Sequence, residues 1–280
     1  MIRKLLVPGL VGVSLFLSGC YEETDTVTVY PDGSGVLHIH KKFGEGYSNM
    51  VTSSGTRTDL QSAIDKALYK ELSLWKGFDA WTGVKASMDG KLVVNDAVGY
   101  FSDVSKLTRT EGTTVQAFTW VKNVDGGFTI AWSNIDSANK NPLDAPPTPP
   151  AQEQQIMAMV KGLKADHVIV LPGAVASAKG CIGQSGRTAT AELNDKNIAD
   201  YYAIVDDYRA RVAKGDITKD KANEDVASKA RDLSMNMEVT CGPGDVDAEM
   251  AQFRKDFENA KADYSSAGTE AKIQDGAKSG

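Results

Sequence analysis

Two histidines are the first residues whose types and spacing suggest chemistry. His38 and His40 lie two residues apart in a segment, residues 36–43, that alternates like a β-strand. Their side chains would share one face of that strand, and with a third ligand they could hold zinc. His167 is the only other histidine in the sequence, and no Cys-x-x-Cys or His-Glu-x-x-His motif accompanies the pair. Because this spacing alone is a weak signal, we expect both histidines to be exposed on a hairpin and predict no metal site.

Two other motifs resemble catalytic or nucleotide-binding signatures but are incomplete. Gly183-Gln184-Ser185-Gly186 is followed by Arg187 and a strand-like segment, whereas a nucleophile elbow has Gly-x-Ser-x-Gly between a strand and a helix. Gly242-Pro243-Gly244 departs from the dinucleotide fingerprint because Asp247 stands at the place of the third glycine. We interpret these segments as a hairpin turn and as the chain leaving a strand. We therefore predict no catalytic residues, no cofactor and no enzymatic activity.

Cys20 is the residue with the most specific chemistry. It ends Leu17-Ser18-Gly19-Cys20, which follows a positive start at Arg3 and Lys4 and a short apolar stretch. A helix that crosses a bilayer needs about 20 apolar residues, so residues 1–19 are typical of a secretory signal peptide. The four residues match the bacterial lipobox, which implies that Cys20 carries acyl chains such as palmitate and begins the mature protein. The alternative is an ordinary signal peptide with a chance cysteine.

An acyl anchor at Cys20 would hold the folded body close to a membrane. Each buried methylene contributes about 0.8 kcal/mol, and two or three chains anchor a protein firmly where one does not. Strand-like alternation begins at Thr26, so the five residues before it span at most about 17 Å. In double-membrane bacteria, an Asp directly after the acylated cysteine resembles the signal that retains a lipoprotein in the inner membrane. This chain has Tyr21 at that position. We therefore predict a lipid-anchored protein of the cell envelope, in the outer membrane if the organism has one.

The charge of the chain argues against a nucleic-acid partner. Without Arg3 and Lys4 of the signal peptide, the chain has 29 basic and 37 acidic residues, a net charge of −8. Such a body is repelled by nucleic acid and by anionic lipid. Attachment to the membrane would therefore depend on the acyl chains.

Cys181 and Cys241 are the two cysteines that follow Cys20. In an exported protein two such thiols are usually paired, so we expect a disulfide between them. It would close a loop of about 60 residues, for which the chain-entropy model gives about 4 kcal/mol of stabilisation. The alternative is two separate buried thiols.

The first half of the chain is typical of an α+β fold. Residues 26–30 and 36–43 alternate around Pro31-Asp32-Gly33-Ser34-Gly35, which predicts a hairpin whose turn is shaped by Asp32. A helix follows, with apolar residues on one face from Leu60 to Trp75. Strand-like segments then cover residues 81–88, 92–101, 114–121 and 128–132. We predict a mainly antiparallel sheet with helices packed on one face.

The second half begins after a proline-rich segment, residues 139–150, which we predict to be an internal loop. A helix, strands at residues 167–171 and 187–193, and a last strand at residues 235–241 follow. Between these strands, residues 194–234 predict an inserted helical hairpin in which Gly215 ends the first helix. Residues 244–280 predict an amphipathic helix and then a disordered tail.

A stripe of tyrosines on the first helix of this hairpin is the candidate binding surface. Tyr201, Tyr202 and Tyr208 fall on one helical face. They would form a ligand or partner surface if exposed, although at helical spacing such a stripe is more often part of a core.

Several segments together resemble a known family. They are VYPDGSGVLHI, WTGVKASMDGKLVVNDAVGYFSDVSKL, and HVIVLPGAVASAKG followed by RTATAEL. Over about residues 24–193 the chain is similar to bacterial LppM-type lipoproteins. The resemblance implies a lipobox-anchored α+β ectodomain of the cell envelope that is not an enzyme and binds lipid or glycolipid. The chain departs from the family in its hairpin at residues 194–234 and in lacking the family's frequent C-terminal transmembrane helix.

The resemblance also places the strands on both sides of the proline-rich loop in one sheet. We therefore predict one ectodomain, residues 20–243, with two domains divided at residues 139–150 as the alternative. The predicted function is a non-enzymatic envelope lipoprotein that binds lipid or another apolar ligand. The alternative is a structural or assembly module that uses the helical hairpin as a surface for an envelope protein partner.

Overall fold

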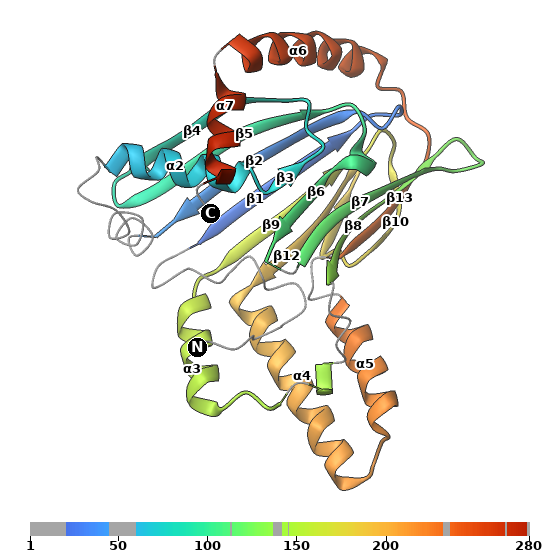
Figure 1. Ribbon diagram of the computed structural model, residues 1–280. Helices are drawn as coiled ribbons and strands as arrows, with labels where there is room; N and C mark the ends of the chain where they lie inside the picture. Colours follow the sequence, from blue (N-terminus) through green and yellow to red (C-terminus); the bar gives the residue numbers. More distant parts are fainter. Residues whose placement is uncertain are drawn as a thin grey trace.

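The computed structural model describes residues 21–44, 60–112, 114–136, 142–144, 146–231, 236–266 and 268–278. Within them the strands form two sheets that pack face to face, with helices around them (Figure 1). The expected α+β class is confirmed, and the strands are divided between two sheets.

The larger sheet is built around β1, which pairs with β2 in antiparallel and with β9 in parallel orientation. Val27 and Val29 of β1 face the interior beside Leu37 and Ile39 of β2, because side chains alternate between the faces of a strand. β1 and β9 come from opposite sides of the proline-rich segment, so strands from both halves of the chain share this sheet. In spatial order the sheet comprises β11 (Gly183–Ser185), β12 (Thr188–Asn194), β9 (Lys164–Val170), β1 (Glu22–Val29), β2 (Gly35–Phe43), β5 (Leu92–Phe101) and β4 (Ala80–Asp89).

The smaller sheet faces β1 and β9 with a row of large apolar side chains. Phe118, Ile130 and Trp132 are buried on its inner face and belong to the same core as the valines of β1. Its spatial order is β10 (Val175–Lys179), β13 (Met237–Cys241), β8 (Phe128–Asp136), β7 (Thr114–Lys122), β6 (Thr108–Glu111) and β3 (Trp75–Lys76).

The turn between β1 and β2 has the predicted chemistry. The Asp32 carboxylate accepts hydrogen bonds from the backbone N–H and from the hydroxyl of Ser34, at 3.0 and 2.5 Å. Gly33 adopts a φ of 82°, which a residue without a Cβ accepts at little cost. These contacts fix the hairpin that starts the larger sheet.

Helices cover both faces of the larger sheet, which corrects our prediction that they pack on one face. α2 (Leu60–Leu72) lies on the inner side and buries Ile64, Leu68 and Leu72, as its spacing predicted. α6 (Asp247–Ser266) lies on the outer side, where Phe257 stacks on Tyr100 of β5 with ring centroids 6.0 Å apart. The predicted C-terminal amphipathic helix is therefore present.

The end of the chain corrects our prediction of a disordered tail. Residues after α6 form α7 (Thr269–Lys278), which packs against α2 (Figure 1). Ile273 is buried in the main core, and an added Cβ on Gly276 would come within 2.9 Å of backbone atoms of Tyr69 and Lys70. Two contacts one turn apart thus dock a helix whose composition is otherwise polar.

The predicted helical hairpin is present as α4 (Asp195–Lys214) and α5 (Lys219–Arg231). A capping box between Asn194 and Asn197 starts α4, and Gly215 ends it with a φ of 80°. The short η2 (Pro142–Asp144) packs on the hairpin, and α3 (Pro150–Val160) lies beside α4. All three α-helices extend from one end of the sheets (Figure 1).

Replacing Gly276 with valine tests whether α7 is docked. The added side chain meets the backbone of α2, so we expect a loss of about 1–3 kcal/mol in the free energy of unfolding, measured with urea. Ala277→Val changes the neighbouring exposed residue and should leave the stability nearly unchanged. Equal stability of both variants and the wild type would contradict the docked position of α7.

Candidate functional site

Charged side chains occupy inward-facing positions at one end of β1. Glu23 and Asp25 have the same orientation as Val27 and are 8% and 0% exposed. Strand pairing places Lys41 of β2 opposite Glu23, and His167 of β9 opposite Asp25. All of these residues are buried between the sheets, so the apolar core gives way here to a polar cluster.

Lys41 is the central cation of this cluster. Its Nζ lies 2.8 Å from Oε1 of Glu23 and also pairs with the carboxylate of Glu71 on α2. Arg109 of β6 lies 3.6 Å from Glu71 and 3.4 Å from Glu111. Although burial alone raises the pKa of Glu23, the Lys41 and Arg109 charges hold it well below its usual range. Glu23 is therefore ionised and paired.

Asp25 lacks such a partner. It is fully buried, and among the described residues no donor reaches its carboxyl oxygens; its hydrogen-bonding neighbour is the Glu23 carboxylate, which can only accept. Burial, and then the nearby charge of Glu23, raise the pKa of Asp25 well above its usual value. A buried charge without compensation is strongly disfavoured, so Asp25 is protonated in the protein alone.

His167 is held flat against an aromatic ring. Its imidazole stacks on Trp132 of β8 with ring centroids 3.9 Å apart and an angle of 2° between the planes. Burial lowers its pKa to about 4, with Arg109 and Lys41 acting in the same direction and Glu23 opposing them. The ring is therefore neutral at neutral pH and keeps a nitrogen lone pair.

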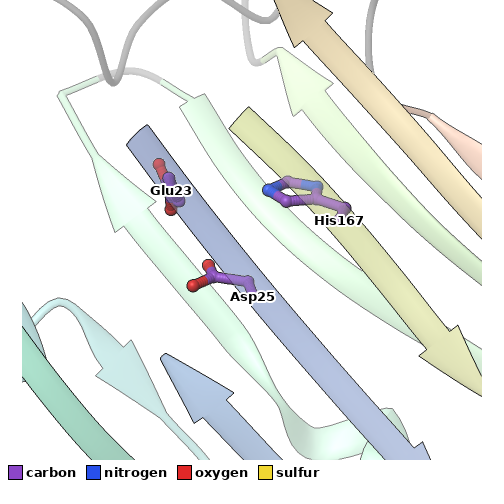
Figure 2. A group of neighbouring side chains, drawn as sticks. All are labelled: Glu23, Asp25 and His167. Carbon is purple, nitrogen blue, oxygen red and sulfur yellow. The ribbon is translucent and has the colours of Figure 1, made fainter. Parts of the chain in front are cut away.

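Glu23, Asp25 and His167 form one compact group (Figure 2). One ligand atom from each lies within 4.8 Å of the others. Two carboxyl groups and an imidazole are a donor set that metal ions use in proteins. This group is not visible in the sequence, because His167 reaches β1 only through long-range strand pairing.

The histidines singled out in the sequence lie elsewhere. His38 and His40 are on the outer face of β2, opposite to the face that carries Lys41. Nδ1 of His40 lies 2.7 Å from Oδ1 of Asp96, and both side chains are 46% exposed. His167 is buried on the inner face of the sheet, so the three histidines do not meet.

The structure corrects the predicted disulfide. Cys181 and Cys241 are free thiols, with Cys181 half-buried and Cys241 buried. Gly180 lies against the backbone of Asn236, five residues before Cys241 on an extended strand. At about 3.3 Å per residue Asn236 lies about 16 Å from Cys241, and Cys181 follows Gly180 at the Asn236 end, beyond the reach of a disulfide to Cys241. Burial raises the pKa of the Cys181 thiol to about 11, which makes it a weak nucleophile at neutral pH.

The tyrosine stripe is part of the interior. Tyr201 and Tyr208 pack inside the α4–α5 hairpin against Ala222 and Val226, and Tyr202 joins the main core. All three tyrosines are at most 8% exposed. They therefore have the core role that was one of the two interpretations, and the binding-surface interpretation is corrected.

Two predictions concern how the chain relates to a membrane. Cys20 and the signal peptide at residues 1–19 lie outside the described residues. In the part of the chain that is described, no helix is long and apolar enough to cross a membrane.

Comparisons with known proteins give little information beyond this geometry. No protein-family model and no curated protein matches the chain. Among solved structures, the NMR structure of the folded domain of LppM from Mycobacterium tuberculosis is 9% identical with a TM-score of 0.32. The match covers 83% of this chain and 95% of that chain. At this level of similarity nothing about function is transferred.

Substituting Lys41 tests whether the ion pair supports the fold. In Lys41→Met the ionised Glu23 loses its buried partner, so we expect a loss of about 3–5 kcal/mol in the free energy of unfolding. Adding Glu23→Gln removes the stranded charge and should restore part of that loss. Lys42→Met is the matched control, since Lys42 is 37% exposed and 3.9 Å from Glu22, and it should cost under about 1 kcal/mol. Equal urea midpoints for Lys41→Met and Lys42→Met would refute the role of the pair.

Proposed function

We propose that the chain is a non-enzymatic lipoprotein of the bacterial cell envelope, anchored by acyl chains on Cys20. The observation that carries this proposal is the lipobox Leu17-Ser18-Gly19-Cys20, after which the folded chain begins at once. Tyr21 is already buried, and β1 starts at Glu22. The described charged cluster is nearly closed to solvent, which supports a role other than catalysis on a free substrate.

The contacts of Tyr21 support a body that lies against the membrane. Its ring packs on Phe43 with centroids 5.3 Å apart, and its carbonyl oxygen accepts a hydrogen bond of 2.8 Å from the N–H of Lys164. An anchored Cys20 would therefore adjoin the folded body directly, with less free chain than the five residues expected from the sequence.

The same contacts orient the body. The strands β1 and β9 begin, and β12 ends, at the same end of the larger sheet, where Asn194 pairs with Lys164. α3 and α4 lie at this end of the molecule (Figure 1). With the anchor at Cys20, this end would face the lipid, and the turn between β1 and β2 would point away from it.

Replacing Cys20 with serine tests the anchor. Serine has no thiol to acylate, so we expect the protein to move from the membrane fraction to the soluble fraction and to lack the mass of the acyl chains. Cys181→Ser, which removes a thiol from the folded body, should remain in the membrane fraction with the acyl mass unchanged. A Cys20→Ser protein that stays with membranes as firmly as the wild type would exclude the lipobox reading.

We further propose that the body binds lipid or another apolar ligand. The hairpin of β7 and β8 exposes Val121 and Val124, at 56% and 110% of their reference areas. Trp120 of the same hairpin lies 3.4 Å from the position of a Cβ on Gly33, so these valines are near the β1–β2 turn. Apolar side chains that would face away from the anchoring membrane support contact with a separate apolar partner.

Native mass spectrometry of the Cys20→Ser protein, released from membranes without detergent, tests this ligand. We expect a stoichiometric lipid mass that is reduced in Val121→Ser/Val124→Ser, because the exposed apolar contact is lost. Ile182→Ser is the control for a distant exposed apolar residue, which is 61% exposed. If the protein carries no bound lipid, the proposed lipid binding is wrong. That result would favour the second candidate function, an assembly module in which the α4–α5 hairpin contacts an envelope protein beside the membrane.

A further inference from the structure

We propose that Glu23, Asp25 and His167 form a binding site for a divalent transition-metal ion, for which Zn²⁺ is the best chemical match. The three residues are buried on neighbouring strands, with ligand atoms within 4.8 Å of one another (Figure 2). The site lies inside the fold, so its ion would be structural.

The donor set favours zinc over other common divalent ions. Zn²⁺ is held in proteins by imidazole nitrogen and carboxylate oxygen at about 2.0–2.2 Å. Ca²⁺ and Mg²⁺ prefer sites made of oxygen ligands alone, and His167 supplies nitrogen. Copper(I), which is monovalent, prefers sulfur ligands, and this group contains none.

Unpartnered polar atoms point to a missing ligand, independently of the acidic character of the cluster. Asp25 is fully buried, and within the described ranges no donor reaches either oxygen of its carboxylate; it can bond to the neighbouring Glu23 carboxylate only by holding a proton. Nδ1 of His167, which is 4% exposed, also lacks a partner among these residues. Buried polar groups in folded proteins are normally bonded, and a metal ion would supply that bond to Asp25.

The balance of charge also favours a divalent cation. When all carboxyl groups are ionised, the cluster has four negative and two positive groups, with a neutral imidazole beside them. A single divalent ion would neutralise this excess. The negative groups are Glu23, Asp25, Glu71 and Glu111, and the positive groups are Lys41 and Arg109.

The geometry requires a modest contraction around the ion. Two ligand atoms on one Zn²⁺ are at most about 4.2 Å apart, twice the bond length of about 2.1 Å. Glu23 already accepts from Lys41 and the Tyr21 hydroxyl, whereas no donor or cation contacts the Asp25 carboxyl group among the described residues. Asp25 and His167 would therefore be the principal ligands and Glu23 the third.

Metal loading during refolding is the direct test, because buried ligands are most accessible in the unfolded chain. The full-length protein is unfolded in detergent with a chelator and refolded with or without ZnCl₂. We expect one Zn²⁺ per chain by elemental mass spectrometry after desalting, and a Tm several degrees above that of the metal-free protein. Refolding with Co²⁺ should give the visible absorption of a low-coordinate site.

Two variants and one control separate this site from surface binding. Asp25→Asn keeps the size of the side chain and removes a buried acid, so it should fold; His167→Gln removes the imidazole. Both should weaken zinc binding about 100-fold or more and abolish the rise in Tm. The double variant His38→Gln/His40→Gln removes the exposed histidines of β2 and should bind zinc as the wild type does.

Two results would overturn the proposal, one from the wild type and one from the variants. Refolded protein without stoichiometric zinc, or zinc that is lost in the His38/His40 variant and retained in Asp25→Asn, would show that the buried group is not a metal site. The Cys20→Ser protein should bind zinc normally, so failure of the anchor and failure of the metal site are separate results.

Discussion

The pairing of Glu23 with Lys41 between the two sheets is the interaction on which this end of the protein depends. Lys41 is 1% exposed, and its Nζ contacts carboxylates from both β1 and α2. Glu71 of α2 in turn meets Arg109 of the smaller sheet. One chain of charges therefore joins the larger sheet, the helix on its inner face and the opposing sheet. If Lys41 were removed, the Glu23 carboxylate would be buried without its cation, which costs more than the pair itself contributes.

These charges also specify which elements meet. In the apolar part of the sandwich, different arrangements of valine, leucine and phenylalanine can bury similar areas. The pairing of Glu23 with Lys41 exists only in the observed register of β1 and β2. A slip of one residue would turn the whole inner face of β1 outward, so that Glu23 and Asp25 would reach solvent and Val27 and Val29 would leave the core. The burial of the β1 valines and the pairing of Glu23 with Lys41 thus require the same register of β1 and β2.

Local features of the fold could be predicted from the sequence, whereas the candidate site could not. Asp32 and Gly33 specify their turn, and Gly215 ends its helix, through contacts within a few residues. Glu23 and Asp25 share the alternation of Val27, which indicates their inward direction, but their partners Lys41 and His167 come from strands distant in sequence. The disulfide prediction failed for a related reason, because counting thiols does not give their separation. The tail prediction failed because Ile273 and Gly276 dock α7 despite its polar composition.

The position of Tyr21 connects the proposed anchor to this buried cluster. Tyr21 follows Cys20 in the sequence, and its hydroxyl donates a hydrogen bond to Glu23, the carboxylate that pairs with Lys41. It leads directly into β1, which is hydrogen-bonded to β2 on one side and to β9 on the other. A force on an acylated Cys20 along the strand would load both ladders in shear, so many hydrogen bonds would share it at once. A central strand with a buried ion pair near its first residue would therefore be a firm point of attachment for a body anchored at Cys20 without a linker.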